Sequence, residues 1–356
     1  MTLHPPRERG AATPTAPGDG PPRRIGKVRR PACLALAVAV LAAACAASVA
    51  IGSANLPLST VWESVTGQGG GIDHLTVRTL RVPRTVLAVL VGAALGVAGA
   101  LIQGLTRNPL ADPGVLGVNA GAQFAIVLAV AVLGVTRIEQ YLWYGFGGAV
   151  AAAVVVHLIA ASGPGGATPL RLTLVGVALS AVLMGAAQTL ALTDPETFER
   201  MRYWAAGTVA DRPDGTLTLI WPFILVGVVL AFACSRGLNA LALGDDVARA
   251  LGARIVATRV VGLLAVTLLC GAATAAAGPI GFVGLMVPHA VRFVTGPDQR
   301  WVLPFSLVLG PVLVLLSDIL GRVVVRPAEL QVGVVTAFLG APVLIALARR
   351  GKARVP

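Results

Sequence analysis

Long, nearly continuous apolar runs alternate with short polar stretches along almost the whole chain. Each run has about 20 residues, the length at which an α-helix crosses a hydrocarbon core of roughly 30 Å. The runs do not alternate apolar and polar residues, so they predict helices rather than the strands of a membrane barrel. About ten spans are expected, at 32–52, 85–105, 115–135, 142–161, 172–192, 217–234, 255–277, 280–294, 302–325 and 332–348. The sequence therefore predicts an all-α polytopic membrane protein.

Polar residues dominate the two ends of the chain. Residues 1–31 are rich in Pro, Gly, Thr and Arg, which predicts a disordered basic tail. The membrane domain is expected over 32–350, with a second short tail at 351–356. Basic residues before the first apolar run also describe a signal peptide, but the run is long for one and more spans follow. An uncleaved first span is the favoured interpretation.

The distribution of charge predicts how the chain lies in the membrane. The 356 residues carry a formal net charge of +12, and 12% are charged, about half the roughly 25% of soluble domains. Much of the excess lies in Arg7–Arg30 and Arg349–Arg354, beside spans, so the positive-inside rule explains it without nucleic acid. The basic joints 236–259 and 292–300 fall on the same side as the ends. Both termini are therefore predicted to be cytoplasmic.

The second predicted span contains small residues at helical spacing. Gly92, Gly96 and Gly99 recur three and four residues apart, which lets neighbouring helices approach closely in lipid. The turn that follows, Arg107-Asn-Pro-Leu-Ala-Asp-Pro-Gly114, contains prolines that end the helix.

Few side chains within the spans could carry chemistry. Asp318 lies inside a span with Arg322 four residues later, so a functional acid and a local ion pair are both open interpretations. His289 follows a proline, and a packed or capping histidine is favoured over a proton relay or metal ligand. Uncharged polar residues within spans could line a wet pathway or bond across helices. They are Gln103, Asn119, Gln123 and Gln188.

Motifs for bound cofactors and for enzymatic chemistry are lacking in the sequence. The four cysteines lie in apolar runs and show no metal-ligand spacing. There is no Walker A sequence, no metalloprotease motif and no nucleophile elbow. We expect no cofactor in this chain and no enzymatic activity of its own, so energy for transport would come from a partner.

A polar island separates the apolar runs 217–234 and 255–277. Its sequence, Leu241-Ala-Leu-Gly-Asp-Asp-Val-Ala-Arg-Ala-Leu-Gly252, predicts a short helix of its own. Asp245 is expected as N-cap, with Arg249 four residues later as an ion-pair partner. Asp246 lies near the positive end of the helix dipole, and Gly252 is a natural stop.

A helix of about two turns is marginal on its own in water. Val247 and Leu251 share one face of the expected helix, between two membrane spans. We therefore expect this apolar face to pack on a partner protein, which the remainder of the chain responds to.

Six stretches together resemble the FecCD-type permease subunits of ABC importers, which carry iron–siderophore complexes, haem or cobalamin. They are Arg81-Val-Pro-Arg84-Thr, Gly92-Ala-Ala-Leu-Gly-Val-Ala-Gly99, Asn108-Pro-Leu-Ala-Asp-Pro-Gly-Val-Leu-Gly117, Leu241–Gly252, Ala277-Gly-Pro-Ile-Gly-Phe-Val-Gly-Leu-Met-Val-Pro-His289 and Gly333-Val-Val-Thr-Ala-Phe-Leu-Gly-Ala-Pro342. They extend from the second span to the last. The segment Glu329-Leu-Gln331 departs from the family, which commonly has Pro where this chain has Gln331.

The resemblance implies ten transmembrane helices per subunit in a bacterial cell membrane and a second permease subunit, identical or paralogous. It also implies two cytoplasmic ATPase subunits and an extracytoplasmic substrate-binding protein. The polar island matches the segment that couples to the ATPase. Its candidate coupling residues are Leu241, Gly244, Asp245, Asp246, Val247, Arg249, Leu251 and Gly252.

Three arginines match positions that receive acidic residues of the binding protein in that family. They are Arg81, Arg84 and Arg322. Each falls at the expected outer end of a span, against the positive-inside bias, and a guanidinium bonds a carboxylate bidentately. An ion- or proton-coupled secondary transporter is the alternative class, which the scarcity of membrane acids disfavours.

Overall fold

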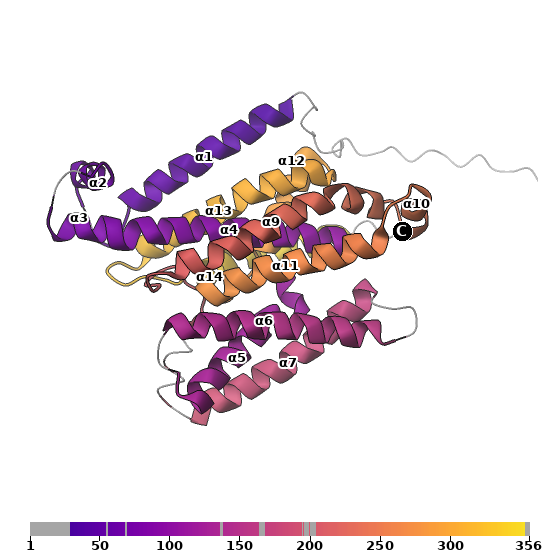
Figure 1. Cartoon of the computed structure of the whole chain (residues 1–356). Coiled ribbons are helices and arrows are strands. Elements are labelled where there is room, and N and C mark those ends of the chain that lie inside the picture. Colours follow the sequence, from indigo (N-terminus) through magenta and orange to yellow (C-terminus); the bar gives the residue numbers. More distant parts are fainter. Residues whose placement is uncertain are drawn as a thin grey trace, which may run out of the picture.

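Apolar helices make up the body of the protein, as the hydrophobic pattern predicts (Figure 1). The computed structural model describes residues 29–352 except 55, 68–69, 136–137, 164–167, 194, 196–198 and 200–203. Within these residues the chain forms helices and no strand. Most of both predicted tails lies outside the described residues. So does most of 194–203, the first half of the charged segment 194–214 whose composition indicates an interfacial or external helix.

Seven of the described helices are long and apolar enough to cross a membrane. They are α1 (Arg30–Ala50), α4 (Val82–Thr106, continuous with the short helices before it), α6 (Ile138–Ala161), α7 (Pro169–Thr193), α9 (Thr216–Leu241), α11 (Ile255–Ala277) and α13 (Gln299–Val324). Three shorter apolar helices are α5 (Val118–Leu133), α12 (Val283–Thr295) and Val332–Ala346 within α14 (Val332–Lys352). Together they occupy the ten predicted spans.

Short helices fill several of the connections. Between α1 and α4 the sequence predicts a polar external loop, but the structure has α2 (Leu58–Val65), α3 (Ile72–Thr76) and the π-helix η2 (Val77–Arg81). The 3₁₀ helix η3 (Pro113–Leu116) precedes α5, and α10 (Asp245–Ala250) joins α9 to α11. α2 and α3 lie at one end of the bundle and α10 at the other (Figure 1).

Helix α4 runs through the centre of the bundle, and every residue from Val91 to Gln103 is buried. Its glycines allow this packing. A Cβ atom on Gly92 would lie 2.6 Å from the backbone of Pro311 on α13, and one on Gly99 would collide with the carbonyl oxygen of Gly284 on α12. The small-residue pattern predicted from the sequence is therefore used for helix–helix contact.

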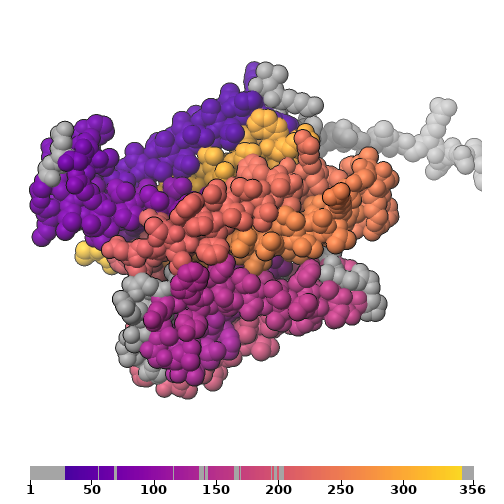
Figure 2. Space-filling model, in the orientation of Figure 1, coloured from indigo at the N-terminus to yellow at the C-terminus, as the bar shows by residue number. Residues whose placement is uncertain are grey.

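The remaining helices surround this core. α5, α6 and α7 pack against one another as a separate layer on one side of the bundle, and α1 lies on the opposite side against α13 (Figures 1 and 2). Large apolar side chains such as Leu36 on α1 and Val182 on α7 are exposed on these outer helices. Such exposed apolar surface is expected where a helix faces lipid.

Candidate functional site

An ion-pair network lies at the end of the bundle that carries α2 and α3. Asp318 and Arg322 are four residues apart on α13, and the guanidinium of Arg322 bonds the Asp318 carboxylate through both Nε and Nη2. Arg84 of α4 approaches the same carboxylate, with Nη2 2.7 Å from Oδ1 and Nε 3.1 Å from Oδ2. The ion-pair interpretation of Asp318 is therefore confirmed. The partner from α4 was not expected.

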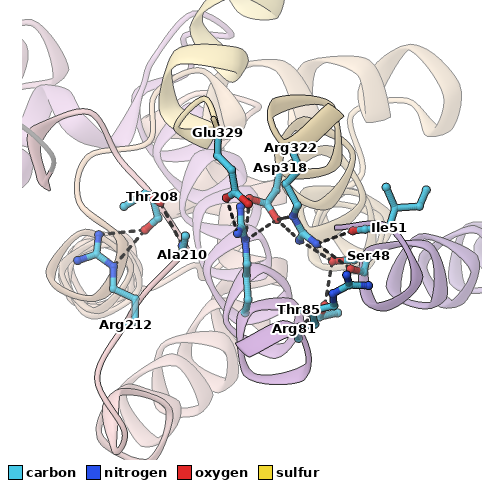
Figure 3. Close-up of polar contacts among 11 residues, drawn as sticks. Ser48, Ile51, Arg81, Thr85, Thr208, Ala210, Arg212, Asp318, Arg322 and Glu329 are labelled. Atoms are coloured by element: carbon cyan, nitrogen blue, oxygen red, sulfur yellow. Dashed lines mark hydrogen bonds and ion pairs between the residues drawn. The ribbon is translucent and has the colours of Figure 1, made fainter. Parts of the chain in front are cut away.

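Arg322 and a further arginine, Arg81, bond backbone carbonyl groups at the end of α1 (Figure 3). The last carbonyl oxygens of a helix have no partner within the helix, and positive charge is favourable there. Arg322 Nη1 donates to the carbonyl oxygens of Ser48 (2.8 Å) and Ile51 (2.9 Å). Arg81 donates to those of Val49, Ala50 and Ala54 at 2.7–3.1 Å.

These contacts turn two of the three candidate docking arginines inward. Arg81 is 5% exposed and Arg322 is 1% exposed, so both guanidinium groups hold α1 rather than face the surroundings. Arg84 also bonds Glu329 Oε2 at 2.7 Å, which neutralises it further. The docking role of the three residues stays a prediction, whereas an architectural role is visible in the structure.

A pocket of about 440 Å³ opens beside the network, between the end of α1, the η2–α4 junction and the start of α9. Its lining includes Arg84, Glu329, Asp211 and Arg212. Burial opposes ionisation of Glu329, but the hydrogen bond and charge of Arg84 prevail and hold the pKa of that carboxyl below its ordinary value. Burial lowers the pKa of Arg212 to about 10 despite the charge of Asp211, and this guanidinium donates to the carbonyl oxygen of Thr208. The pocket therefore carries charges of both signs.

At the opposite end, α10 forms where the polar island predicts a helix, but its start differs from the prediction. Gly244 is the N-cap, with φ 101°, a left-handed conformation that favours glycine, and no side chain caps the helix. Asp245 is instead the first helical residue. Arg249 bonds Asp246 at 2.8 Å rather than Asp245. The predicted N-cap role and the predicted 245–249 pair are therefore both wrong.

The Asp245 carboxylate binds two arginines that the sequence analysis did not single out. Arg107 Nη2 lies 2.8 Å from Oδ1, and Arg259 Nη2 lies 3.1 Å from Oδ1 and 2.8 Å from Oδ2. Arg107 follows α4 and Arg259 belongs to α11. The carboxylate is thus turned toward the bundle, and it is unavailable for capping its own helix.

The apolar side chains of this segment point away from the protein. Val247 is 48% exposed and Leu251 is 66% exposed, whereas Ala248 is the buried residue of α10. Leu251 follows the last helical residue, and Gly252 adopts φ 73°, which fits the predicted stop. Leu241 at the end of α9 is buried. An exposed apolar surface at this end is consistent with the expected partner contact.

Of the four pathway candidates, two bond across helices. Gln103 is buried and donates to the carbonyl oxygens of Gly284 (3.0 Å) and Leu285 (3.2 Å), while Arg292 donates to its Oε1. Asn119 Oδ1 accepts a 2.8 Å hydrogen bond from Thr274.

The other two differ, because Gln123 is half-buried and Gln188 on α7 is exposed. Among the described residues no hydrogen bond joins any of the four candidates to another. Their role in a pathway stays a prediction.

The structure also bears on His289. Its ring packs edge-on against Phe293, with 4.9 Å between ring centroids, and Nε2 is buried without a hydrogen-bond partner. These contacts favour the packing interpretation. Within the described part of the chain, no three His, Cys, Asp or Glu side chains come together as a metal site.

Comparison with known proteins agrees with this architecture. The model of the FecCD transport family matches residues 40–350. The chain is 49% identical over 311 residues to the ferric enterobactin transport system permease protein FepD of Escherichia coli (strain K12), covering 87% of this chain and 93% of that one. It is 36% identical over 312 residues to the hemin transport system permease protein HmuU of Yersinia pestis, covering 85% and 92%.

A solved structure shares the arrangement of helices. It is a metal-chelate type ABC transporter in an inward-facing conformation, with a TM-score of 0.78 and 26% sequence identity. The match covers 90% of this chain and 99% of that chain.

Proposed function

The chain belongs to the FecCD transport family and is a permease of the kind that ABC importers use for siderophores, iron or haem; from this premise we propose that its cargo is a ferric siderophore. In this proposal an extracytoplasmic binding protein delivers the complex. Two cytoplasmic ATPase subunits drive its passage between this chain and a second permease subunit.

The observation that carries the proposed cargo is the extended identity to the ferric enterobactin permease, which is higher than that to the haem permease. The identity runs through the membrane helices and is not confined to one motif. Similarity along the membrane domain, whose lining would contact the cargo, therefore supports the proposal of a ferric siderophore.

The two ends of the bundle support the proposed division of partners. At one end Val247 of α10 and Leu251, which follows that helix, are exposed to the surroundings, and they form a surface suited to a groove on the ATPase. At the other end the 440 Å³ pocket presents Arg84 and Arg212 beside acidic residues, a surface suited to charged groups of a binding protein. In this proposal the end that carries α10 faces the cytoplasm, as do both termini.

The alternative, an ion- or proton-coupled secondary transporter, has less support. Such a transporter needs membrane carboxylates that gain and lose protons or bind ions. Asp318, the acid that the sequence offers for this role, is held by both Arg84 and Arg322. Both oxygens of this carboxylate accept hydrogen bonds from guanidinium groups, which orient it within the protein and occupy it in structural contacts.

Uptake assays in a bacterial strain lacking the gene would test the proposal. The strain is supplied with labelled ferric siderophores, haem or cobalamin, with and without a plasmid copy of the gene. We expect uptake of a ferric siderophore to return with the gene and to require ATP. Uptake that stops with a protonophore while ATP is maintained would indicate the secondary transporter instead, and restored uptake of haem alone would reassign the cargo.

A further inference from the structure

The Asp245 carboxylate is the point at which α10 meets two core helices. It accepts hydrogen bonds from Arg107, which ends α4, and from Arg259, on the second turn of α11. Both carboxylate oxygens are used, and Arg259 spans the two of them. A carboxylate held by two guanidinium groups has a fixed orientation, because each planar donor set defines a direction.

Most of the other side chains of α10 are exposed. Val247 points outward, and the pair of Asp246 and Arg249 lies on the exposed surface within the helix itself. Ala248 is buried, close to the chain segments that enter and leave α10. Among the described hydrogen bonds and ion pairs, Asp245–Arg107 is therefore the one that ties α10 to α4.

Arg107 lies at the junction of α4 and the loop that leads to α5, so a displacement of its side chain could move both. It is the C-cap of α4 and has φ 53°, a left-handed conformation that turns the chain out of the helix. The following loop leads to Asp112, whose Oδ1 accepts from Gly114 N at 2.8 Å and starts η3 ahead of α5. One turn before Arg107, Gln103 bonds α12. Arg107 thus connects the buried centre of the bundle with the loop that enters α5.

We propose that Asp245 is a positioning residue that passes movements of α10 to α4 and α11. This inference rests on the proposed function, in which the ATPase acts on α10. The three side chains are partly exposed, so the ion pairs contribute little to the stability of the fold. The role of the two ion pairs is to transmit movement. When the ATPase displaces α10, they make α4 and α11 move with it.

The test uses the complete importer, with its ATPase and binding protein, in proteoliposomes. ATP hydrolysis and siderophore transport are measured on the same preparation, and the ratio of the two is the readout. For Asp245→Asn we expect transport to fall much more than hydrolysis, so that ATP hydrolysed per siderophore rises roughly tenfold. Asp245→Glu keeps the charge and should restore most of the normal ratio.

Arg107→Gln tests the contact with α4 separately from the contact with α11, because it removes the Asp245–Arg107 pair and leaves the Asp245–Arg259 pair in place. This variant should also raise the number of ATP molecules hydrolysed per siderophore. If Asp245→Asn does not accumulate in the membrane, Arg107→Gln alone tests the proposal. Arg300→Gln is the matched control. It removes an exposed arginine near the same end, where Asn239 of α9 bonds Asp298, without touching Asp245. Its ratio should stay at the wild-type value.

Three outcomes are informative. A raised ratio in Asp245→Asn and Arg107→Gln, with the ATPase still co-purifying, supports the proposal. A wild-type ratio in both variants overturns it. Loss of the ATPase from the Asp245→Asn complex also overturns it, because the residue would then serve attachment rather than transmission. In that last case the proposed function survives, since α10 would still be the ATPase contact.

Discussion

The sequence around Asp318 indicates one of its two arginine partners and not the other. Its spacing to Arg322 predicts a local pair on one helix face, and the pair is present. Arg84 lies 234 residues away in sequence, so only the packing of α4 against α13 brings it to the same carboxylate. Burial of Arg81 also could not be predicted from the sequence, because the carbonyl oxygens that it bonds belong to the backbone and leave no sequence signal.

Replacement of Asp318 by asparagine should destabilise the protein strongly. Asp318 is 1% exposed, and loss of its charge leaves Arg322 without this buried partner and leaves Arg84 paired with Glu329 alone. Removing one partner of a buried pair costs roughly 3–5 kcal/mol. We expect a lower thermal unfolding midpoint in detergent and lower abundance in the membrane. Glu63→Gln, at an exposed position 4.0 Å from His74, is the control and should change little. Equal midpoints for the two variants would contradict the assigned role of Asp318.

At the scale of elements, α4 was predictable in position and in its packing surface. The recurrence of Gly92, Gly96 and Gly99 indicated close helix contacts, and the structure has them with α12 and α13. The sequence could not indicate which helices supply the other side, because many spans contain small residues. Partner choice depends on three-dimensional arrangement, which local patterns do not encode.

Gly99→Ala is expected to destabilise the α4–α12 contact. An added Cβ would meet the carbonyl oxygen of Gly284, part of the backbone of another helix, so the helices must separate. Overpacking of this kind costs roughly 1–3 kcal/mol. Gly147→Ala on α6 is the matched control, since nothing lies within 4 Å of its added methyl group, and a helical glycine replaced by alanine gains about 0.5–1 kcal/mol. Thermal unfolding in detergent measures both. An unchanged unfolding midpoint for Gly99→Ala would show that α4 and α12 can separate slightly without loss of stability.

Helix α10 was predicted as an element but not in its contacts. The predicted segment 241–252 contains the observed helix 245–250. The predicted cap failed because Gly244 already turns the chain at φ 101°, and because Arg107 and Arg259 compete successfully for the Asp245 carboxylate. Two guanidinium groups bring full positive charges, and Arg259 contacts both oxygens of the carboxylate, which one backbone amide cannot do.

Leu251→Asp should separate the permease from its ATPase. Leu251 is 66% exposed, so the substitution does not disturb the core, and membrane insertion should be normal. A carboxylate buried in an apolar groove of a partner without a counter-ion is costly, so the contact should fail. The measurement is co-purification of the ATPase at equal membrane abundance, and transport should be lost with it. Leu251→Met keeps the apolar contact and is the control. Normal co-purification and transport by Leu251→Asp would exclude this surface as the ATPase contact.

At the scale of the whole molecule, each apolar run expected from the sequence contains an apolar helix, and seven of the described helices are long enough to cross a membrane. The thickness of the hydrocarbon core sets the length of each apolar run, and this constraint acts on every span independently. The short helices α2 and α3 were missed, because polar residues such as Glu63 and Asp73 resemble those of a loop. The pocket at that end was missed for a different reason, since it forms between segments far apart in the chain.

Reporter fusions would test the orientation that the charge distribution predicts. A reporter placed after Gly71 or after Asp211 should be extracytoplasmic, and one after Asp298 should be cytoplasmic. The physical reason is the excess of Lys and Arg in the joints on the predicted inner side. Alkaline phosphatase, active outside, and green fluorescent protein, fluorescent inside, should give opposite signals at each site. Phosphatase activity after Asp298 but none after Gly71 would reverse the orientation.

The arginine contacts at the end of α1 have a consequence for how the protein is made. Among the described helices α1 comes first in chain order, and Arg81, which bonds Val49 and Ala50, follows it closely. Arg322, which bonds Ser48 and Ile51, is synthesised 274 residues after Ser48. The bonds between Arg322 and the end of α1 can therefore form only after α13 has been synthesised. A chain that stops before α13 leaves this end of α1 without them, a difference by which a membrane protease could distinguish it from a chain that contains α13.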